Sequence, residues 1–499
     1  MRVAVFLHRW LGVVLCLLFL LWFPSGIGMM YWDFPEVTAS DRLERSPALN
    51  PAAIHLSPAA AYAAAGPSPP PSQIRLNTFD GRPVYRFRAG RGETVVYADT
   101  GERQAAVSSD GVARIAAAWV RQPTAAATAV TLDDADQWTV QGSFRAQRPL
   151  TKFSWPNGEQ VYVSPASGEV VQYTTRASRL GAYLGPIPHW IYFTPLRRHQ
   201  LIWSRVVIWT SGAGTIAAIL GLVVGVVRYS PSKRYRRDGA PASLPYRGQK
   251  RWHTVLGLIF GLGAATWAFS GMLSMDPWPS LSPRNPTDIP QALRGRPPIA
   301  GFAARDPRAA LAALPGLQVK ELELASFGGE AVYVATLARG GSRIVGMTGP
   351  ARDAFDERRI VELLTRAAQP QGLAETRVLE RYDAYYLDRR RARPLPVILA
   401  RVNDAERTRY YIDPKTARLA GSYSARTWMS RWLYHGLHSL DFPWLYDYRP
   451  LWDIVVITFM IGGTALCVTS LILAWRVLGG YFFAGGVQRA GLSAGPLSR

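Results

Sequence analysis

Four long apolar runs stand out along the chain, separated by segments of mixed polarity. A helix needs about 20 apolar residues to cross a bilayer, and each run reaches or exceeds that length. We therefore predict four membrane-spanning helices, at residues 10–31, 203–227, 254–275 and 452–478. We expect the first helix to be retained, because its apolar stretch is too long for a signal peptide and no small-residue cleavage site follows it.

The two long segments between these runs show the patterns of small α+β domains. The stretch "LSPAAAYAAA" at 56–65 predicts a short helix that begins at a serine cap. Stretches such as "VYRFR", "VYVSP" and "VYVATL" alternate β-branched and aromatic residues between turn signals, which predicts antiparallel hairpins. Helical periodicity at 356–370, ended by Pro370, predicts a second helix.

The distribution of basic residues predicts the orientation in the membrane. The short segment 228–251 carries eight Arg or Lys residues and one Asp, and the N-terminus carries Arg2 and Arg9. Short basic loops stay in the cytoplasm, so both termini and this loop should be cytoplasmic. The predicted order is a helix (1–31), an extracytoplasmic domain (32–200), a helix (201–228), a basic loop (229–251), a helix (252–275), a second extracytoplasmic domain (276–450), a helix (451–478) and a tail (479–499).

Overall composition narrows the class of protein further. The net charge is +22, which can indicate a nucleic-acid-binding protein. Here many of the arginines flank the membrane segments and the others are scattered, so we expect no nucleic acid partner. Cys16 and Cys467 both lie inside apolar runs, and the chain has no CxxC pair or disulfide framework.

An internal repeat relates the two halves of the chain. The segment that begins at His8 aligns without gaps with the segment that begins at His253, at an offset of 245 residues, and Ser25-Gly26 then meets Ser270-Gly271. The segment that begins at His189 aligns with the one that begins at His438, at an offset of 249. We interpret the chain as a tandem duplication whose halves are related by a pseudo-two-fold axis along the membrane normal.

The repeat singles out four histidines. A pseudo-two-fold axis brings equivalent residues to the same depth, so His8 should lie beside His253 at the cytoplasmic edge and His189 beside His438 at the outer edge. Two opposed imidazoles are the axial ligands of a six-coordinate haem iron. We therefore predict two b-type haems, bound without covalent attachment because no CxxCH motif is present.

Three further histidines lack such a pairing. His435 precedes His438 by three residues, and its counterpart in the first half is Pro186. It is a candidate alternative ligand, or a contact of a haem propionate or of the substrate. His199 among its arginines is read as an interfacial anchor, with ligation as the alternative, and His55 as a surface residue.

Two other readings of clustered histidines fit less well. A zinc site needs three or four ligands in one cluster, whereas these histidines divide between two membrane faces. A proton relay needs ionisable groups inside the membrane, and the centres of the apolar runs contain no Asp, Glu, Lys or Arg.

The motifs resemble those of a known family. The stretches "LHRWLG…SG", "RWHTVLG…SG" and "HGLHSLDF" resemble the PepSY-associated transmembrane family, and "LSPAAAYAAA", "TVVYADTGE" and "VYVSPASGEV" resemble PepSY domains. That family includes iron-regulated inner-membrane proteins and ferric-siderophore reductases. The resemblance implies a four-helix transmembrane bundle with two PepSY-like domains, and a haem-containing reductase with His8, His253, His189 and His438 as ligands.

Two hypotheses of function follow. In the first, the chain is a di-haem oxidoreductase of a bacterial inner membrane that passes electrons to a periplasmic acceptor, with a ferric siderophore favoured. No dinucleotide-binding fingerprint is present, so the electron donor is expected to be a quinol or a partner protein. In the second, the helices only anchor PepSY modules that bind a peptide or protein in the periplasm.

Overall fold

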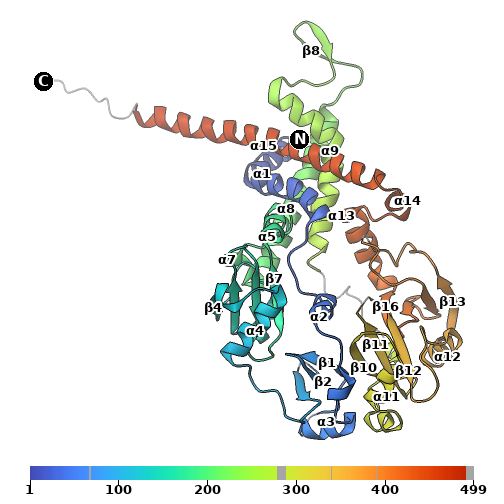
Figure 1. Cartoon of the computed structure of the whole chain (residues 1–499). Helices are drawn as coiled ribbons and strands as arrows, with labels where there is room; N and C mark the ends of the chain where they lie inside the picture. Colours follow the sequence, from blue (N-terminus) through green and yellow to red (C-terminus); the bar gives the residue numbers. More distant parts are fainter. Residues whose placement is uncertain (67–68, 91, 278–287, 339, 389, 491–499) are drawn as a thin grey trace.

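Four long helices form a bundle at one end of the molecule (Figure 1). The computed structural model describes residues 1–66, 69–90, 92–277, 288–338, 340–388 and 390–490. All four are long and apolar enough to cross a membrane, as the sequence predicts. They are α1 (Arg2–Tyr31), α8 (Gln200–Arg228), α9 (Gly248–Leu273) and α15 (Leu451–Ala490). The fourth helix thus extends into the predicted tail, of which 491–499 lie outside the described residues.

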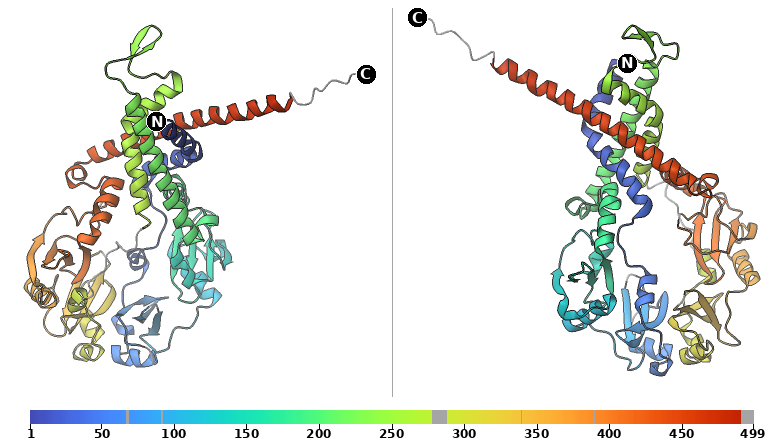
Figure 2. Two further views of the ribbon diagram at one scale, coloured as in Figure 1. Left: turned by 180° about the vertical axis from the view of Figure 1, so that it is seen from behind. Right: turned by 45° about the horizontal axis from the view of Figure 1, so that its top comes forward.

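The four helices pack as a ring. Helix α1 packs on α8, α8 on α9, α9 on α15, and α15 on α1, so α1 and α9 lie diagonally across the bundle. Helix α15 crosses the others obliquely (Figures 1 and 2). Close approach depends on glycine: a side chain at Gly463 of α15 would overlap the ring of Phe23 on α1. Small residues of this kind are typical of helix contacts in membranes.

Outside the bundle, the two halves contain the same sequence of elements: a short helix, three strands, a helix and four strands. In the first half these are α3 (Pro58–Ala64), β1 (Gln73–Phe79), β2 (Arg82–Ala89), β3 (Gly92–Tyr97), α4 (Ser109–Val120), β4 (Thr128–Leu132), β5 (Leu150–Ser154), β6 (Gln160–Val163) and β7 (Val170–Thr174). In the second half they are α11 (Pro307–Ala312), β10 (Val319–Phe327), β11 (Glu330–Leu337), β12 (Ser342–Gly346), α12 (Glu357–Ala367), β13 (Leu373–Leu379), β14 (Val397–Val402), β15 (Arg409–Asp413) and β16 (Arg418–Tyr423).

The helices predicted outside the membrane are confirmed. The side chain of Ser57 caps α3, as expected of the serine that opens "LSPAAAYAAA". Helix α12 is capped by Asp356 and ends before Pro370. The predicted hairpins are present as well, since β6 pairs with β7 and β15 with β16, both antiparallel.

The strands form one sheet that the sequence did not predict. Two four-stranded sheets, β4-β5-β6-β7 and β13-β14-β15-β16, belong to one half each. The remaining strands join across the halves in a six-stranded sheet of order β12-β11-β10-β1-β2-β3. Strands β1 and β10 pair antiparallel at its centre, with Ile74 opposite Leu324 and Leu76 opposite Leu322. The two α+β segments are therefore physically joined, in addition to their links through the membrane.

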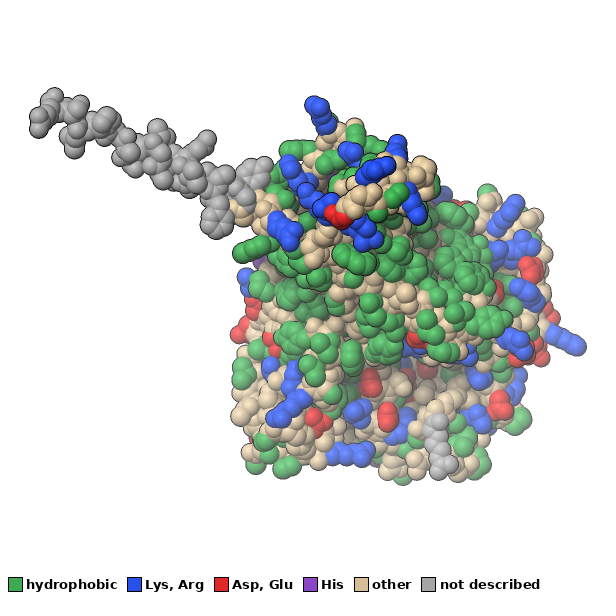
Figure 3. All heavy atoms as spheres, turned by 90° about the horizontal axis from the view of Figure 1, so that it is seen from above, with side chains coloured by type: hydrophobic (Ala, Val, Ile, Leu, Met, Phe, Trp, Pro, Cys, Tyr) green, Lys and Arg blue, Asp and Glu red, His purple; other side chains and the backbone are tan. Residues whose placement is uncertain are grey.

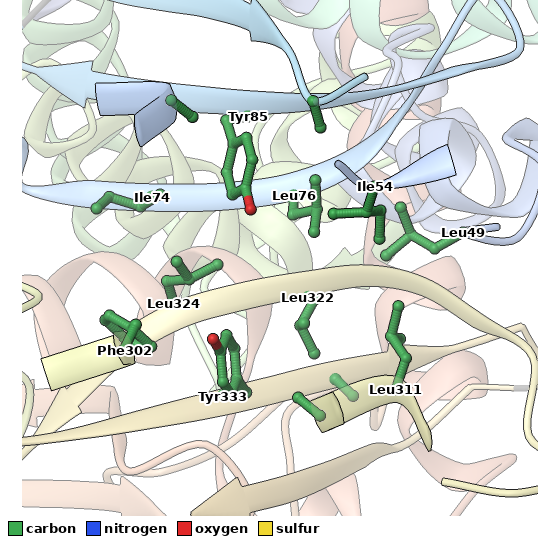
Figure 4. Packing of buried hydrophobic residues seen from close by; sticks show 14 of the residues in the cluster. Leu49, Ile54, Ile74, Leu76, Tyr85, Phe302, Leu311, Leu322, Leu324 and Tyr333 are labelled. Atoms are coloured by element: carbon green, nitrogen blue, oxygen red, sulfur yellow. The ribbon is translucent and has the colours of Figure 1, made fainter. Parts of the chain in front are cut away.

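A single core covers one face of the shared sheet (Figure 4). Both halves contribute to it, and its largest members, Tyr85 and Tyr333, are completely buried. The hydroxyl of Tyr85 donates to the carbonyl of Leu56, and that of Tyr333 to the carbonyl of Arg305. Each half thus supplies one tyrosine to the joint between the halves.

Short helices connect each four-stranded sheet to the membrane helix that follows it. In the first half these are α5 (Arg176–Leu184), α6 (Pro186–Trp190) and α7 (Thr194–Arg197). In the second half a π-helix, η7 (Met429–Gly436), leads into α13 (Leu437–Ser439) and α14 (Pro443–Tyr446). The junction between α5 and α6 lies tightly on α1, because a Cβ at Gly28 would overlap the backbone of Leu184 and Gly185.

Candidate functional site

One pair of histidines lies inside the bundle, near the end that carries the N-terminus. His8 on α1 and His253 on α9 face each other across the bundle diagonal, with ring centroids 6.0 Å apart and ring planes inclined by 40°. His8 Nδ1 donates to the carbonyl of Ala217 on α8, at 2.8 Å. His253 Nδ1 lies 3.2 Å from Thr469 Oγ1 on α15. The Thr469 hydroxyl donates to Leu466, so it accepts from His253.

A second pair lies at the opposite end of the bundle. His189 on α6 and His438 on α13 have ring centroids 5.9 Å apart. His189 Nδ1 lies 3.3 Å from Ser25 Oγ, and His438 Nδ1 lies 3.1 Å from Ser270 Oγ. Each serine hydroxyl donates to the carbonyl three residues before it, Trp22 or Trp267, and therefore accepts from the imidazole.

These hydrogen bonds leave the other ring nitrogen, Nε2, available in all four histidines. An imidazole that donates from Nδ1 is held in one tautomer and one orientation, which is the usual arrangement of a metal-binding histidine. A metal–imidazole bond is about 2 Å long, so two histidines on opposite sides of one iron have ring centroids about 6 Å apart. Both pairs have this spacing.

Burial keeps the outer pair in the neutral form that binds a metal. It lowers the pKa of His189 to about 4. Burial, together with the neighbouring His189, lowers the pKa of His438 to about 3. Both rings are therefore uncharged at neutral pH.

A cavity adjoins the outer pair, and its walls reflect the repeat. Equivalent residues of the two halves line it together: Trp22 and Trp267, Gly26 and Gly271, His189 and His438, Trp203 and Trp452, and Val207 and Val456. Its volume is about 200 Å³, below the roughly 300–1,000 Å³ of most sites for organic ligands. Flexible methionines also line it, so a flat macrocycle could be admitted by their movement; they are Met29, Met30, Met275 and Met460.

Glycines leave space beside the inner pair. A Cβ atom at Gly221 would lie 2.5 Å from Cε1 of His8. Gly12 and Gly257 follow their histidines by four residues, so they lie on the same helix face. Among the residues that the structure describes, a Cβ at Gly12 would meet nothing within 4 Å, and one at Gly257 only Leu466, at 3.9 Å. The residues present thus fit a flat group held between His8 and His253.

The other predicted candidates do not belong to these pairs, although His435 lies near His438 through the ring of Tyr434. His435 is exposed on the π-helix η7, with its ring 4.7 Å from that of Tyr434, and it does not line the cavity. His199 is exposed at the N-terminus of α8. His55 is exposed and bonds the carbonyl of Asp99. Within the residues that the structure describes, no three His, Cys, Asp or Glu side chains gather as a metal site.

Sequence reasoning missed several residues around the histidines. The sequence did contain a signal for Ser25 and Ser270, because both belong to the Ser-Gly pairs that the repeat aligns. Thr469 and Ala217 had none, since they lie on other helices and only tertiary packing brings them to the rings. Tyr434, whose ring is 5.5 Å from that of His438, was also missed.

Comparison with known proteins now identifies the family. No match is found among the curated proteins. A family model described as the PepSY-associated TM region matches residues 5–338, which include nearly all of α1, helices α8 and α9, and every strand of the shared sheet except β12. Because this match covers well over half of the chain, the protein is a membrane protein of the PepSY-associated transmembrane family.

Proposed function

We propose that the chain is a di-haem oxidoreductase that moves electrons across a bacterial inner membrane to a periplasmic acceptor. The observation that supports this best is the presence of two opposed histidine pairs at the two ends of one four-helix bundle. The proposal includes a tandem duplication, which the equal order of elements in the two halves supports. It also places both termini in the cytoplasm, which the basic segment 228–251 supports.

In this proposal the chain holds and orients two haem b groups. His8 and His253 hold the inner haem, and His189 and His438 hold the outer one. When bound, each haem would supply an iron that accepts and releases one electron. Ala217, Thr469, Ser25 and Ser270 hold the rings by accepting hydrogen bonds from Nδ1. The apolar helices exclude water from both sites.

A ferric siderophore is the acceptor that the family resemblance favours. Its hard oxygen donors match ferric iron, and they hold ferrous iron less tightly. One-electron reduction would therefore release the metal. The electron donor would be a quinol or a cytoplasmic partner protein, since the segments between the helices on that side are too short for a nucleotide-binding domain.

The visible spectrum of the purified protein tests the proposal. We expect a Soret band and, after addition of dithionite, sharp α and β bands, with two haems per chain. A ferric siderophore added without oxygen should then restore the oxidised spectrum. A colourless protein would instead support the reading in which the helices only anchor PepSY modules.

A side chain at Gly221 should remove the inner haem. In Gly221→Leu the new side chain takes the space of the His8 ring, whose Cε1 lies 2.5 Å from the Cβ position. We expect haem content to fall from two to about one per chain, measured as the pyridine haemochrome. Gly479→Leu on α15 is the control, because a Cβ there meets nothing within 4 Å in the described part of the chain and Gly479 lies beyond the inner pair. Equal haem content in Gly221→Leu and the wild type would contradict the assigned position of the inner site.

Removal of a serine hydroxyl should raise the reduction potential of the outer haem. Ser270 accepts a hydrogen bond from His438, which makes the ring a stronger donor to iron and favours the ferric state. We expect Ser270→Ala to raise the potential by about 10–40 mV, which corresponds to a fraction of the free energy of one hydrogen bond. Redox titration followed in the α band measures this. Ser211→Ala, a serine lining the same cavity, should leave the potential unchanged; an equal shift in both variants would exclude a specific role of the bond.

A further inference from the structure

A basic hairpin projects from the inner end of the bundle. It connects α8 to α9, and its strands β8 (Tyr235–Arg237) and β9 (Ala240–Ala242) pair antiparallel. Asp238 and Gly239 form the turn with φ of 52° and 80°, as a two-residue hairpin turn of type I′ requires. The Ser230 N–H donates to the carbonyl of Ser243 and closes the base of the hairpin. Figure 1 shows it beyond the ends of the membrane helices.

The hairpin and its base carry strong positive charge. Exposed cations cover the segment, and its single acidic residue, Asp238, pairs with Arg247 at 2.6 Å. The exposed cations are Lys233, Arg234, Arg236, Arg247 and Lys250. Figure 3 views the molecule from this end and shows basic side chains gathered there. The surface therefore attracts anions.

Membrane topology explains only part of this charge. The positive-inside rule acts through Lys and Arg near the helix ends, and Arg228, Arg247, Lys250 and Arg251 already lie there. The remaining cations, Lys233, Arg234, Arg236 and Arg237, lie on the folded hairpin or at its base. The topology rule requires no folded ribbon, whereas a rigid ribbon fits a binding surface that is ordered before its partner arrives.

Distance also argues against lipid headgroups as the occupant. Three-residue strands at about 3.3 Å per residue raise the turn by about 10 Å above the base of the hairpin. The Debye length at physiological ionic strength is about 8 Å, so headgroup charge is partly screened at Arg236 and Arg237, which lie on β8 between the base and the turn. A soluble partner that approaches from the cytoplasm meets the hairpin first.

We infer that this hairpin docks a small acidic electron-carrier protein, which is the electron donor of the chain. The inference rests on the proposed function and selects the partner protein over the quinol. Helix α9 begins at Gly248 and places His253 five residues further on, so the docking surface lies at the same end of the bundle as the inner pair. In the transfer one electron leaves the reduced carrier and reduces the chain by one electron, with no bond made or broken.

Binding of an acidic carrier tests the inference without any electron transfer. Oxidised flavodoxin is the probe, added to the full chain in nanodiscs of neutral lipid, with the dissociation constant measured calorimetrically. We expect Lys233→Glu/Arg234→Glu/Arg236→Glu to weaken binding at least about tenfold. Raising the NaCl concentration from about 20 to about 200 mM should also weaken flavodoxin binding by the wild type. The control Arg145→Glu/Arg358→Glu/Arg391→Glu changes exposed arginines of the α+β segments and should leave binding unchanged.

A milder variant keeps the test valid if charge reversal disturbs insertion of the chain into the membrane. Lys233→Gln/Arg234→Gln/Arg236→Gln leaves the basic residues at the helix ends in place and should still weaken binding. Unchanged flavodoxin binding in both hairpin variants would overturn the inference. So would a hairpin effect confined to nanodiscs of anionic lipid, or reduction by a soluble quinol with no flavodoxin binding. A colourless protein that still binds flavodoxin through the hairpin would refute the proposed haems and leave the docking surface established.

Discussion

Replacement of His8 by alanine should reduce the haem content from two to about one per chain. His8 is one half of the inner pair, and its loss leaves a single imidazole, that of His253, at that site. The outer site is built on other residues, so its haem should be retained. The pyridine haemochrome assay relative to protein mass measures the ratio. His253→Ala should give the same result, because the two rings are equivalent in the pair.

Two histidines outside the pairs serve as controls. His55→Ala and His199→Ala should keep both haems, because each ring is exposed and neither lines the cavity of the outer pair. Full haem content in both His8→Ala and His253→Ala would refute the assignment of the inner ligands. Loss of all haem in every histidine variant would instead indicate a folding defect.

The proximity of the histidine pairs could be predicted from the sequence because a repeat constrains space. Equivalent residues of two halves that cross the membrane in the same direction must lie at similar depths, whatever the details of packing. The structure places His8 beside His253 and His189 beside His438, as this argument expects. Whether the rings hold haem remains a prediction.

The joining of the two halves outside the membrane could not be predicted in the same way. The alternation of side chains in β1 and β10 predicts two strands with one buried face each, but it carries no information about which strand lies alongside. The pairing of Ile74 with Leu324 depends on how the halves meet. The π-helix η7 is a further case, because its sequence aligns with an α-helical region of the first half.

The polar face of the shared sheet carries a network of ion pairs across the joint between the halves. Arg75 on β1 lies 2.7 Å from Glu93 on β3 and 3.7 Å from Glu321 on β10. Arg86 on β2 is 5% exposed and bonds both Glu93, at 3.1 Å, and Glu169, at 2.9 Å. Burial alone would raise the pKa of Glu93, but Arg86 and Arg75 outweigh it and lower that pKa. The ionised Glu93 therefore stabilises the folded state at neutral pH, and this stabilisation is lost as the pH falls through the lowered pKa.

Arg86→Ala should be among the most destabilising single changes in this network. It removes the cation shared by Glu93 and Glu169 and leaves Asn77 without its donor from Nε. Removing one partner of a buried ion pair costs about 3–5 kcal/mol. The midpoint of thermal unfolding of the solubilised protein, followed by tryptophan fluorescence, should fall by several degrees.

A neighbour on the same strand provides the matched control. Arg88 also reaches Glu93, at 3.4 Å, but its side chain is half exposed. Exposed pairs contribute about 0–1 kcal/mol, so Arg88→Ala should shift the midpoint little. Lowering the pH should reduce the difference in unfolding midpoint between the Arg86→Ala variant and the wild type, because protonation of Glu93 removes its attraction to Arg86. Equal midpoints for the two variants at neutral pH would mean that the ion pairs of Arg86 contribute no more to stability than the exposed pair of Arg88.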